Sequence, residues 1–182
     1  MSILEIILIG AGLAMDASAV CLSAGLVYRG LTRRQKLSMP LAFALFQGLM
    51  PVAGYFLGRI FADAVNAYSG IISFIILGII GAGMIREAFS SEDDCPKKQF
   101  TVKVLLIQAV ATSIDAFAVG VGFAVSGTEI FSSAAIIAAV TFVCSLVAVF
   151  IGQKAGEYLG CRAQIVGGAI LILIGLKALL GL

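Results

Sequence analysis

Apolar residues occur along this chain in long blocks rather than at every second position or at every third to fourth position. Polar, proline or glycine breaks separate six such blocks of about 20–25 residues, each long enough to cross a hydrocarbon layer as a helix. The alternation typical of barrel strands is missing, and only helices or closed barrels satisfy backbone polar groups in lipid. The pattern therefore predicts an all-α integral membrane protein with six transmembrane helices, at residues 3–26, 39–58, 67–89, 102–125, 131–152 and 162–181.

Composition agrees with a chain embedded in the lipid bilayer. The 182 residues are 61% hydrophobic and 12% charged, whereas a soluble domain is about half apolar and about a quarter charged. A net charge of +2, with the basic residues lying between apolar blocks, indicates no nucleic-acid partner. The chain has no histidine and no visible nucleophile–base set, so we expect no enzyme. The four cysteines are scattered and are predicted to be buried small hydrophobic residues.

The basic residues predict how the chain is oriented in the membrane. Ten of the twelve fall in or beside the loops after the first, third and fifth apolar blocks, which share one side. Because cytoplasmic loops carry an excess of Lys and Arg, these loops are predicted to be cytoplasmic and both termini to lie outside. On the opposite side the sequence places only Arg59 and Lys177.

Two acidic motifs stand inside the apolar blocks. The segment Leu13–Val20 contains Asp16, and a near-copy 99 positions later, Ser113–Gly120, contains Asp115. A carboxylate within a membrane span is costly, so it marks an ion or substrate site by default. The alternative is a lone acid held against a serine or a backbone carbonyl, which is less attractive because the same context occurs twice.

The repeated motif indicates a duplicated chain. We expect a first three-helix repeat at 1–89, a charged cytoplasmic linker at 90–101 and a second three-helix repeat at 102–182. Three spans are an odd number, so the second repeat enters the membrane in the opposite orientation, as in many secondary transporters. An axis in the membrane plane would then bring both aspartates to similar depth between the halves. The linker could also capture metal ions, although a solvated connection is the simpler interpretation.

Helical spacing adds further oxygen donors to the two aspartates. Carboxylate, amide and hydroxyl oxygens without histidine suit Mg²⁺, Ca²⁺ or Mn²⁺ better than copper or zinc, but they do not choose among the three. A hydroxyl in such a helix can also simply bond back to its own backbone. The glycine patterns 54-x-x-x-58 and 152-x-x-x-156-x-x-x-160 predict close helix packing. The predicted metal ligands are Asp16, Asp115, Gln47, Thr112, Thr141 and Ser145.

The paired motifs M-D-A-x-A-V and T-S-I-D-A-F-A-V-G-V-G, with Gln47-x-x-x-Pro51-x-x-Gly54, resemble the bacterial manganese efflux pump family MntP, a branch of the LysE-type exporters. The resemblance covers essentially the whole chain. It implies six helices in the bacterial inner membrane, export of Mn²⁺ from the cytoplasm, and a central role for Asp16 and Asp115. Some relatives have Glu where this chain has Gln47, which removes one anionic ligand.

Together these observations predict a secondary transporter that exports Mn²⁺ by alternating access, with the ion held between the two aspartates and released when protons enter from outside. No nucleotide-binding loop is present in the sequence, so a gradient must supply the energy. Mn²⁺ is expected as the transported substrate, with no permanent cofactor. The alternatives left open are an exporter of another cation or of an amino acid, and a membrane scaffold subunit without transport of its own.

Overall fold

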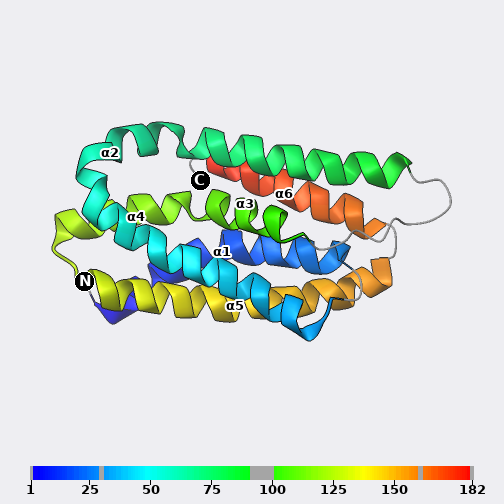
Figure 1. Ribbon diagram of the computed structural model, residues 1–182, viewed down its shortest axis with the longest axis horizontal. Coiled ribbons are helices and arrows are strands. Elements are labelled where there is room, and N and C mark those ends of the chain that lie inside the picture. The colour runs from blue at the N-terminus through cyan, green and yellow to red at the C-terminus, as the bar shows by residue number, and fades with distance from the viewer. Residues whose placement is uncertain (1, 29–30, 91–100, 160–161, 181–182) are drawn as a thin grey trace.

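The computed structural model describes residues 2–28, 31–90, 101–159 and 162–180, although not every side chain within them. Every regular element in these ranges is a helix, which confirms the all-α prediction for this part of the chain (Figure 1). The elements are α1 (Ile3–Val27), α2 (Arg33–Ser90), α3 (Val102–Thr112), α4 (Ile114–Ser126), α5 (Ile130–Leu159) and α6 (Arg162–Leu180).

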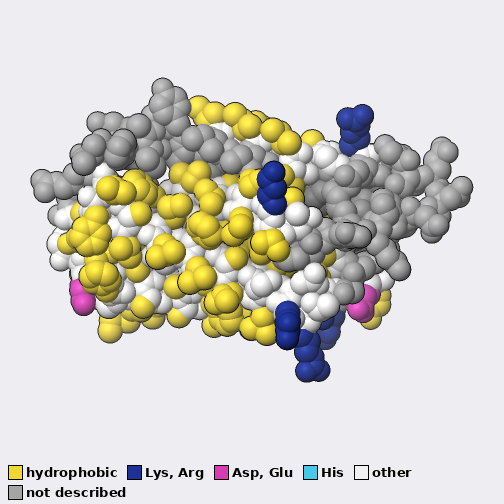
Figure 2. Space-filling view, in the orientation of Figure 1, with side chains coloured by type: hydrophobic (Ala, Val, Ile, Leu, Met, Phe, Trp, Pro, Cys, Tyr) yellow, Lys and Arg dark blue, Asp and Glu magenta, His cyan; other side chains and the backbone are white. Residues whose placement is uncertain are grey.

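Four helical stretches are long and apolar enough to cross a membrane, which supports the prediction of a multi-pass membrane protein. They lie at residues 3–27, 33–57, 102–124 and 130–158, and a shorter apolar helical stretch covers 165–174. Large apolar side chains such as Leu8, Leu49 and Phe131 are more than half exposed on the outside of the bundle. Figure 2 shows hydrophobic side chains over much of the described surface, as expected where lipid replaces water.

Helix α2 differs from the prediction of two separate helices at 39–58 and 67–89. Helical structure continues from Arg33 to Ser90 without interruption, but the helix bends back on itself, so that its second arm runs back along the bundle beside α6 (Figure 1). The break predicted at residues 59–66 contains two alanines and no proline or glycine. Alanine is the strongest helix former, so the backbone keeps its helical form through the turn.

The helix predicted at 102–125 is broken at Ser113, which is a correction to the sequence analysis. Ser113 has φ −104° and ψ 2°, ends α3 and begins α4. The Thr112 hydroxyl donates to the Gln108 carbonyl at 2.9 Å, and both the amide and the hydroxyl of Ser113 donate to the Val110 carbonyl at 3.1 Å. Serine and threonine compete in this way with the backbone ladder, which explains the interruption.

The helices pack through close approaches of backbone to backbone. A Cβ at Gly25 of α1 would lie 2.6 Å from the Val149 carbonyl oxygen of α5, and Gly152 meets Leu22 in the same way. Between α2 and α4, Gly54 abuts Phe117 and Gly120 abuts Pro51. The predicted packing role is thus confirmed for Gly54, Gly152 and, against Leu26, for Gly156. Gly58 and Gly160 lie outside the residues whose packing is described.

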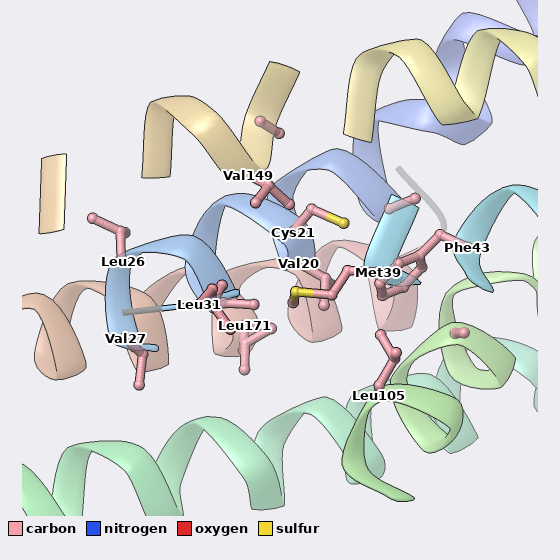
Figure 3. Close-up of a cluster of buried hydrophobic side chains, with 14 of the residues drawn as sticks. Val20, Cys21, Leu26, Val27, Leu31, Met39, Phe43, Leu105, Val149 and Leu171 are labelled. Carbon is pink, nitrogen blue, oxygen red and sulfur yellow. The ribbon is translucent and has the colours of Figure 1, made fainter. Parts of the chain in front are cut away.

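Two apolar clusters form the core. One joins α1, α2, α3, α5 and α6 and includes Val20, Cys21 and Phe43 (Figure 3); the other includes Leu13 and Ile137. Cys21 is fully buried, as predicted, but Cys144 is exposed on α5, so that prediction was wrong for Cys144. Cys95 and Cys161 lie outside the described residues, and so do residues 91–100 of the predicted linker.

Candidate metal-ion site

Asp16 lies in the middle of α1, and its carboxylate is already paired with a cation. Lys177 Nζ of α6 donates to Asp16 Oδ1 at 2.8 Å. The Asp16 side chain is 19% exposed and that of Lys177 is 42% exposed. Further along the same pair of helices, the Ser23 hydroxyl donates to the Gly167 carbonyl at 2.9 Å. The two contacts show that α1 and α6 run antiparallel and bring Lys177 to the depth of Asp16.

Asp115 occupies a different local environment, in the first turn of α4 directly after the break. Its Oδ1 accepts a hydrogen bond from the Ala116 amide at 2.9 Å. The positive end of a helix dipole favours a carboxylate at this position.

Gln47 connects the two acidic motifs directly. Its side chain is fully buried, and Nε2 donates to the Thr112 carbonyl at 3.0 Å and, in a longer hydrogen bond, to the Leu13 carbonyl at 3.4 Å. Leu13 precedes Asp16 by three residues, and Thr112 precedes Asp115 by three. Gln47 thus spans equivalent carbonyls of the two motifs. Its Oε1 is buried and has no hydrogen-bond partner among the described residues.

The three predicted hydroxyl ligands are all buried, but they are not equivalent. Thr112 donates to carbonyls of its own helix, Gln108 at 2.9 Å and Ala109 at 3.3 Å. Thr141 and Ser145 on α5 are completely buried, and neither hydroxyl has a hydrogen-bond partner within the described part of the chain. The Cys21 thiol lies beside Ser145. Buried polar atoms are normally paired, so unpaired ones invite a water or an ion.

Neighbouring contacts bring the α5 hydroxyls toward the level of Gln47. Gly48 follows Gln47 on α2. A Cβ built on Gly48 would lie 3.1 Å from the Cβ of Ala138 on α5. Ala138 precedes Thr141 by three residues, which is about one helical turn. The close contacts of Pro51 and Gly54 with α4 fix the start of that helix, and with it Asp115, against the same arm of α2.

The donor set is rich in oxygen but poor in anions. Where the structure describes side chains, no group of three or more His, Cys, Asp or Glu residues comes together. An ion here would take two carboxylates at most and the remainder from amide, hydroxyl or carbonyl oxygens. Such oxygen ligands suit hard divalent cations. Sequence reasoning missed Lys177 as the partner of Asp16, although a lone lysine in the last apolar block is itself an intramembrane charge.

A bundle of long apolar helices with charged side chains inside it, Asp16 with Lys177 and Asp115, is an arrangement found in polytopic membrane transport proteins. A family profile described as "Putative manganese efflux pump" matches residues 30–179. The chain belongs to this family, MntP, which is a family of transporters and not of enzymes.

Individual relatives match over nearly their full length, each under the name "Putative manganese efflux pump MntP". The relative from Ruminiclostridium cellulolyticum is 45% identical over 179 residues, covering 97% of this chain and 95% of the relative. The relative from Methanobrevibacter smithii is 44% identical, covering 99% of this chain and 98% of the relative. The relative from Methanosphaera stadtmanae is 42% identical, covering 98% of this chain and 99% of the relative. No solved structure has significant similarity to the chain.

Proposed function

We propose that this protein exports Mn²⁺ from the cytoplasm across the plasma membrane as a secondary transporter, with Asp16 and Asp115 as the anionic ligands of the ion. The observation that carries this proposal is the Gln47 bridge. A single buried amide donates to the carbonyl three residues before each aspartate, so the two motifs meet around one polar point in an otherwise apolar bundle. Manganese as the substrate comes from the family and from the names of the relatives.

The remaining ligands are proposed from the unpaired oxygens. Gln47 Oε1 and the hydroxyls of Thr141 and Ser145 are buried without partners among the described residues, and Thr112 contributes an oxygen beside them. The break at Ser113 adds the carbonyl end of α3 and the amide end of α4 next to Asp115. Interrupted helices supply ion sites near the membrane midplane in many secondary transporters.

Inverted repeats covering residues 1–89 and 102–182 are the second part of the proposal. Two helix pairs support them, because α1 packs against α5, and α4 packs against the first arm of α2. Both pairs use glycines in backbone contact, Gly25 with Gly152 in one and Gly54 with Phe117 in the other. If α1 corresponds to α3 and α4 together, and the first arm of α2 to α5, a two-fold axis exchanges these two interfaces.

The repeats suggest a transport cycle. Rocking one half against the other would open the site alternately to each side. A proton arriving from outside would compete with the metal for a carboxylate and release it. We still expect both termini to lie outside the cell. This orientation is supported by Arg33, Arg34 and Lys36 in the first turn of α2, by Lys103 at the start of α3, and by Lys154 on α5 beside the end of α1. Lys177 is the exception, because it lies at the level of Asp16.

The decisive experiment measures Mn²⁺ flux into proteoliposomes containing wild-type protein, Asp16→Asn or Asp115→Asn. We expect either substitution to abolish flux, and to abolish Mn²⁺ resistance in an efflux-deficient host, because the ion loses an anionic ligand in a low-dielectric site. Glu157→Gln is the matched control, since Glu157 is an exposed carboxylate on α5 and its neutralisation should leave flux intact. Wild-type flux in both aspartate variants would reject the site.

The same assay separates the alternative functions. A panel of Mn²⁺, Mg²⁺, Ca²⁺, Cd²⁺ and basic amino acids would identify an exporter of another solute, because the preferred substrate would compete with Mn²⁺. A membrane scaffold subunit would move none of them. Absence of any flux from correctly folded wild-type protein would therefore overturn the proposed function as a whole.

A further inference from the structure

Lys177 is the one cation that the structure brings into contact with a proposed metal ligand, within the part of the chain that it describes. The ammonium lies 2.8 Å from Asp16 Oδ1. Lys177 stands in the last turn of α6, on a helix tied to α1 by the Ser23–Gly167 hydrogen bond. An intramembrane ion pair of this kind requires an explanation, because both charges are costly in lipid.

The ammonium and a divalent metal would compete for the Asp16 carboxylate. An oxygen ligand holds Mg²⁺ or Ca²⁺ at about 2.0–2.6 Å, and Mn²⁺ is a hard cation of the same kind. The metal would then stand close to an ammonium that is 2.8 Å from the same atom. Such an approach of two cations is strongly repulsive where the dielectric is low. A carboxylate oxygen can accept a hydrogen bond while it binds a metal, so the competition between Lys177 and the ion comes from the repulsion of their positive charges.

Charge balance favours withdrawal of Lys177 when the ion binds. Two carboxylates and one ammonium carry a formal charge of −1, and a divalent ion added to all three makes +1. The same ion with the two carboxylates alone makes a neutral site, which is favoured in a low-dielectric interior. The Lys177 side chain is 42% exposed and therefore has room to move, and lysine places its charge on a flexible four-carbon stem.

We propose that Lys177 is the resident counter-cation of Asp16: the ammonium neutralises this carboxylate when no metal is bound, the transported divalent ion displaces it, and its return helps to expel the ion. This inference rests on the proposed function, because it assigns a role to Lys177 at the same site. The competing explanation is a structural tie between α1 and α6. The two explanations predict opposite signs: a competitor weakens metal binding, whereas a tie that shapes the site strengthens it.

The first test measures Mn²⁺ binding to purified full-length protein through the electron paramagnetic resonance signal of free Mn²⁺. We expect Lys177→Met to bind Mn²⁺ about tenfold more tightly or better, because a unit positive charge beside the site has been removed. Mn²⁺ flux at saturating ion should fall, because release is slowed. Lys177→Arg keeps the charge and should remain much closer to wild type. In the Asp16→Asn background, Lys177→Met should no longer tighten binding, since the ammonium has lost the carboxylate for which it competes.

A second test uses the wild-type protein and does not depend on a variant that folds. Amine labelling followed by mass spectrometry should find Lys177 more reactive with Mn²⁺ present than without it, because the ammonium has left Asp16. Lys154, exposed on α5, provides the internal reference and should label equally under both conditions. NaCl at the same ionic strength distinguishes displacement at the site from general screening.

The outcomes separate this inference from the function on which it rests. If wild-type protein binds and transports Mn²⁺ while Lys177→Met binds equally or more weakly, or if labelling of Lys177 does not rise with Mn²⁺, the counter-cation role is wrong and the transporter stands. If wild-type protein neither binds nor transports Mn²⁺, the proposed function is wrong, and the role of Lys177 that rests on it is wrong as well. Tighter binding together with slower flux in Lys177→Met would support the inference against a purely structural tie.

Discussion

The two acidic motifs have almost the same sequence but lie in different local structures. Asp16 sits within the continuous helix α1 and pairs with Lys177 at 2.8 Å. Asp115 follows a break in the helix and is held by the amide of its own first turn at 2.9 Å. The residues just before each aspartate account for the break. Leu13 and Ala14 carry no hydroxyl, whereas Thr112 and Ser113 bond back to preceding carbonyls.

This comparison shows that a duplicated motif does not guarantee a duplicated environment. One copy has its charge balanced by a side chain from a distant helix, and the other by the dipole of the helix that it begins. A symmetric pair of carboxylates therefore becomes an asymmetric site. We expect substitutions on the two sides to differ in stability as well as in transport.

The largest expected effect is on the packing that holds α4 in place. Gly120→Ala would push a methyl group into the Pro51 backbone of α2, so the helices must separate, at a cost of about 1–3 kcal/mol. Gly122→Ala is the matched control on the same helix, because a Cβ there meets no atom within 4 Å. Thermal unfolding in detergent should show a lower melting temperature for the first and no decrease for the second, because alanine favours the helix more than glycine does. Equal melting temperatures would contradict the close α2–α4 contact.

Gln47→Met should break the link between the two motifs. Both Nε2 hydrogen bonds, to the Leu13 and Thr112 carbonyls, are lost, at a cost of about 1–2 kcal/mol. Thr141→Val is the comparison, because the Thr141 hydroxyl has no partner in the described structure and its loss should not lower the melting temperature. If Thr141 binds the ion, Thr141→Val should nevertheless reduce Mn²⁺ flux. Full stability in Gln47→Met would show that the bridge is dispensable.

A smaller difference should separate the two aspartates in the absence of metal. Asp16→Asn leaves Lys177 without its anionic partner and should lower stability by about 1 kcal/mol or less, since the lysine side chain is partly exposed. Asp115→Asn should cost less, because among the described residues the Asp115 carboxylate is held only by the Ala116 amide of its own turn. Thermal unfolding of both variants in detergent without metal checks this prediction. A larger loss of stability in Asp115→Asn than in Asp16→Asn would contradict this prediction.

The smallest effect concerns the break itself. Ser113→Ala removes the 3.1 Å hydroxyl bond to Val110 and should change stability by at most about 0.5 kcal/mol, while amide hydrogen exchange across residues 110–116 slows as the helix closes. Ala14→Ser is the reciprocal change, and α1 should stay continuous because Leu13 offers no second hydroxyl. Unchanged exchange in Ser113→Ala would mean that neighbouring helices, rather than the local hydroxyls, impose the break.

Much of the fold could be predicted because a membrane helix is recognisable from a short stretch of sequence. Long apolar blocks identified helical spans without reference to any partner, and the glycine spacing identified Gly54 and Gly152 as packing positions. The errors lie where local patterns compete. A polar stretch read as a break remained helical because alanine favours the helix, and an apolar stretch read as continuous was interrupted by two hydroxyl residues.

For this protein, the sequence by itself determined the membrane-embedded helical class, the family, and the two aspartates as candidate ligands, because hydropathy and a repeated motif can be detected within short stretches of chain. Only the tertiary structure decided that Lys177 neutralises Asp16, that Gln47 joins Leu13 to Thr112, and that Thr141 and Ser145 are buried without partners. These are contacts between residues up to 161 positions apart. They depend on how whole helices pack, and no local pattern encodes which side chains then meet.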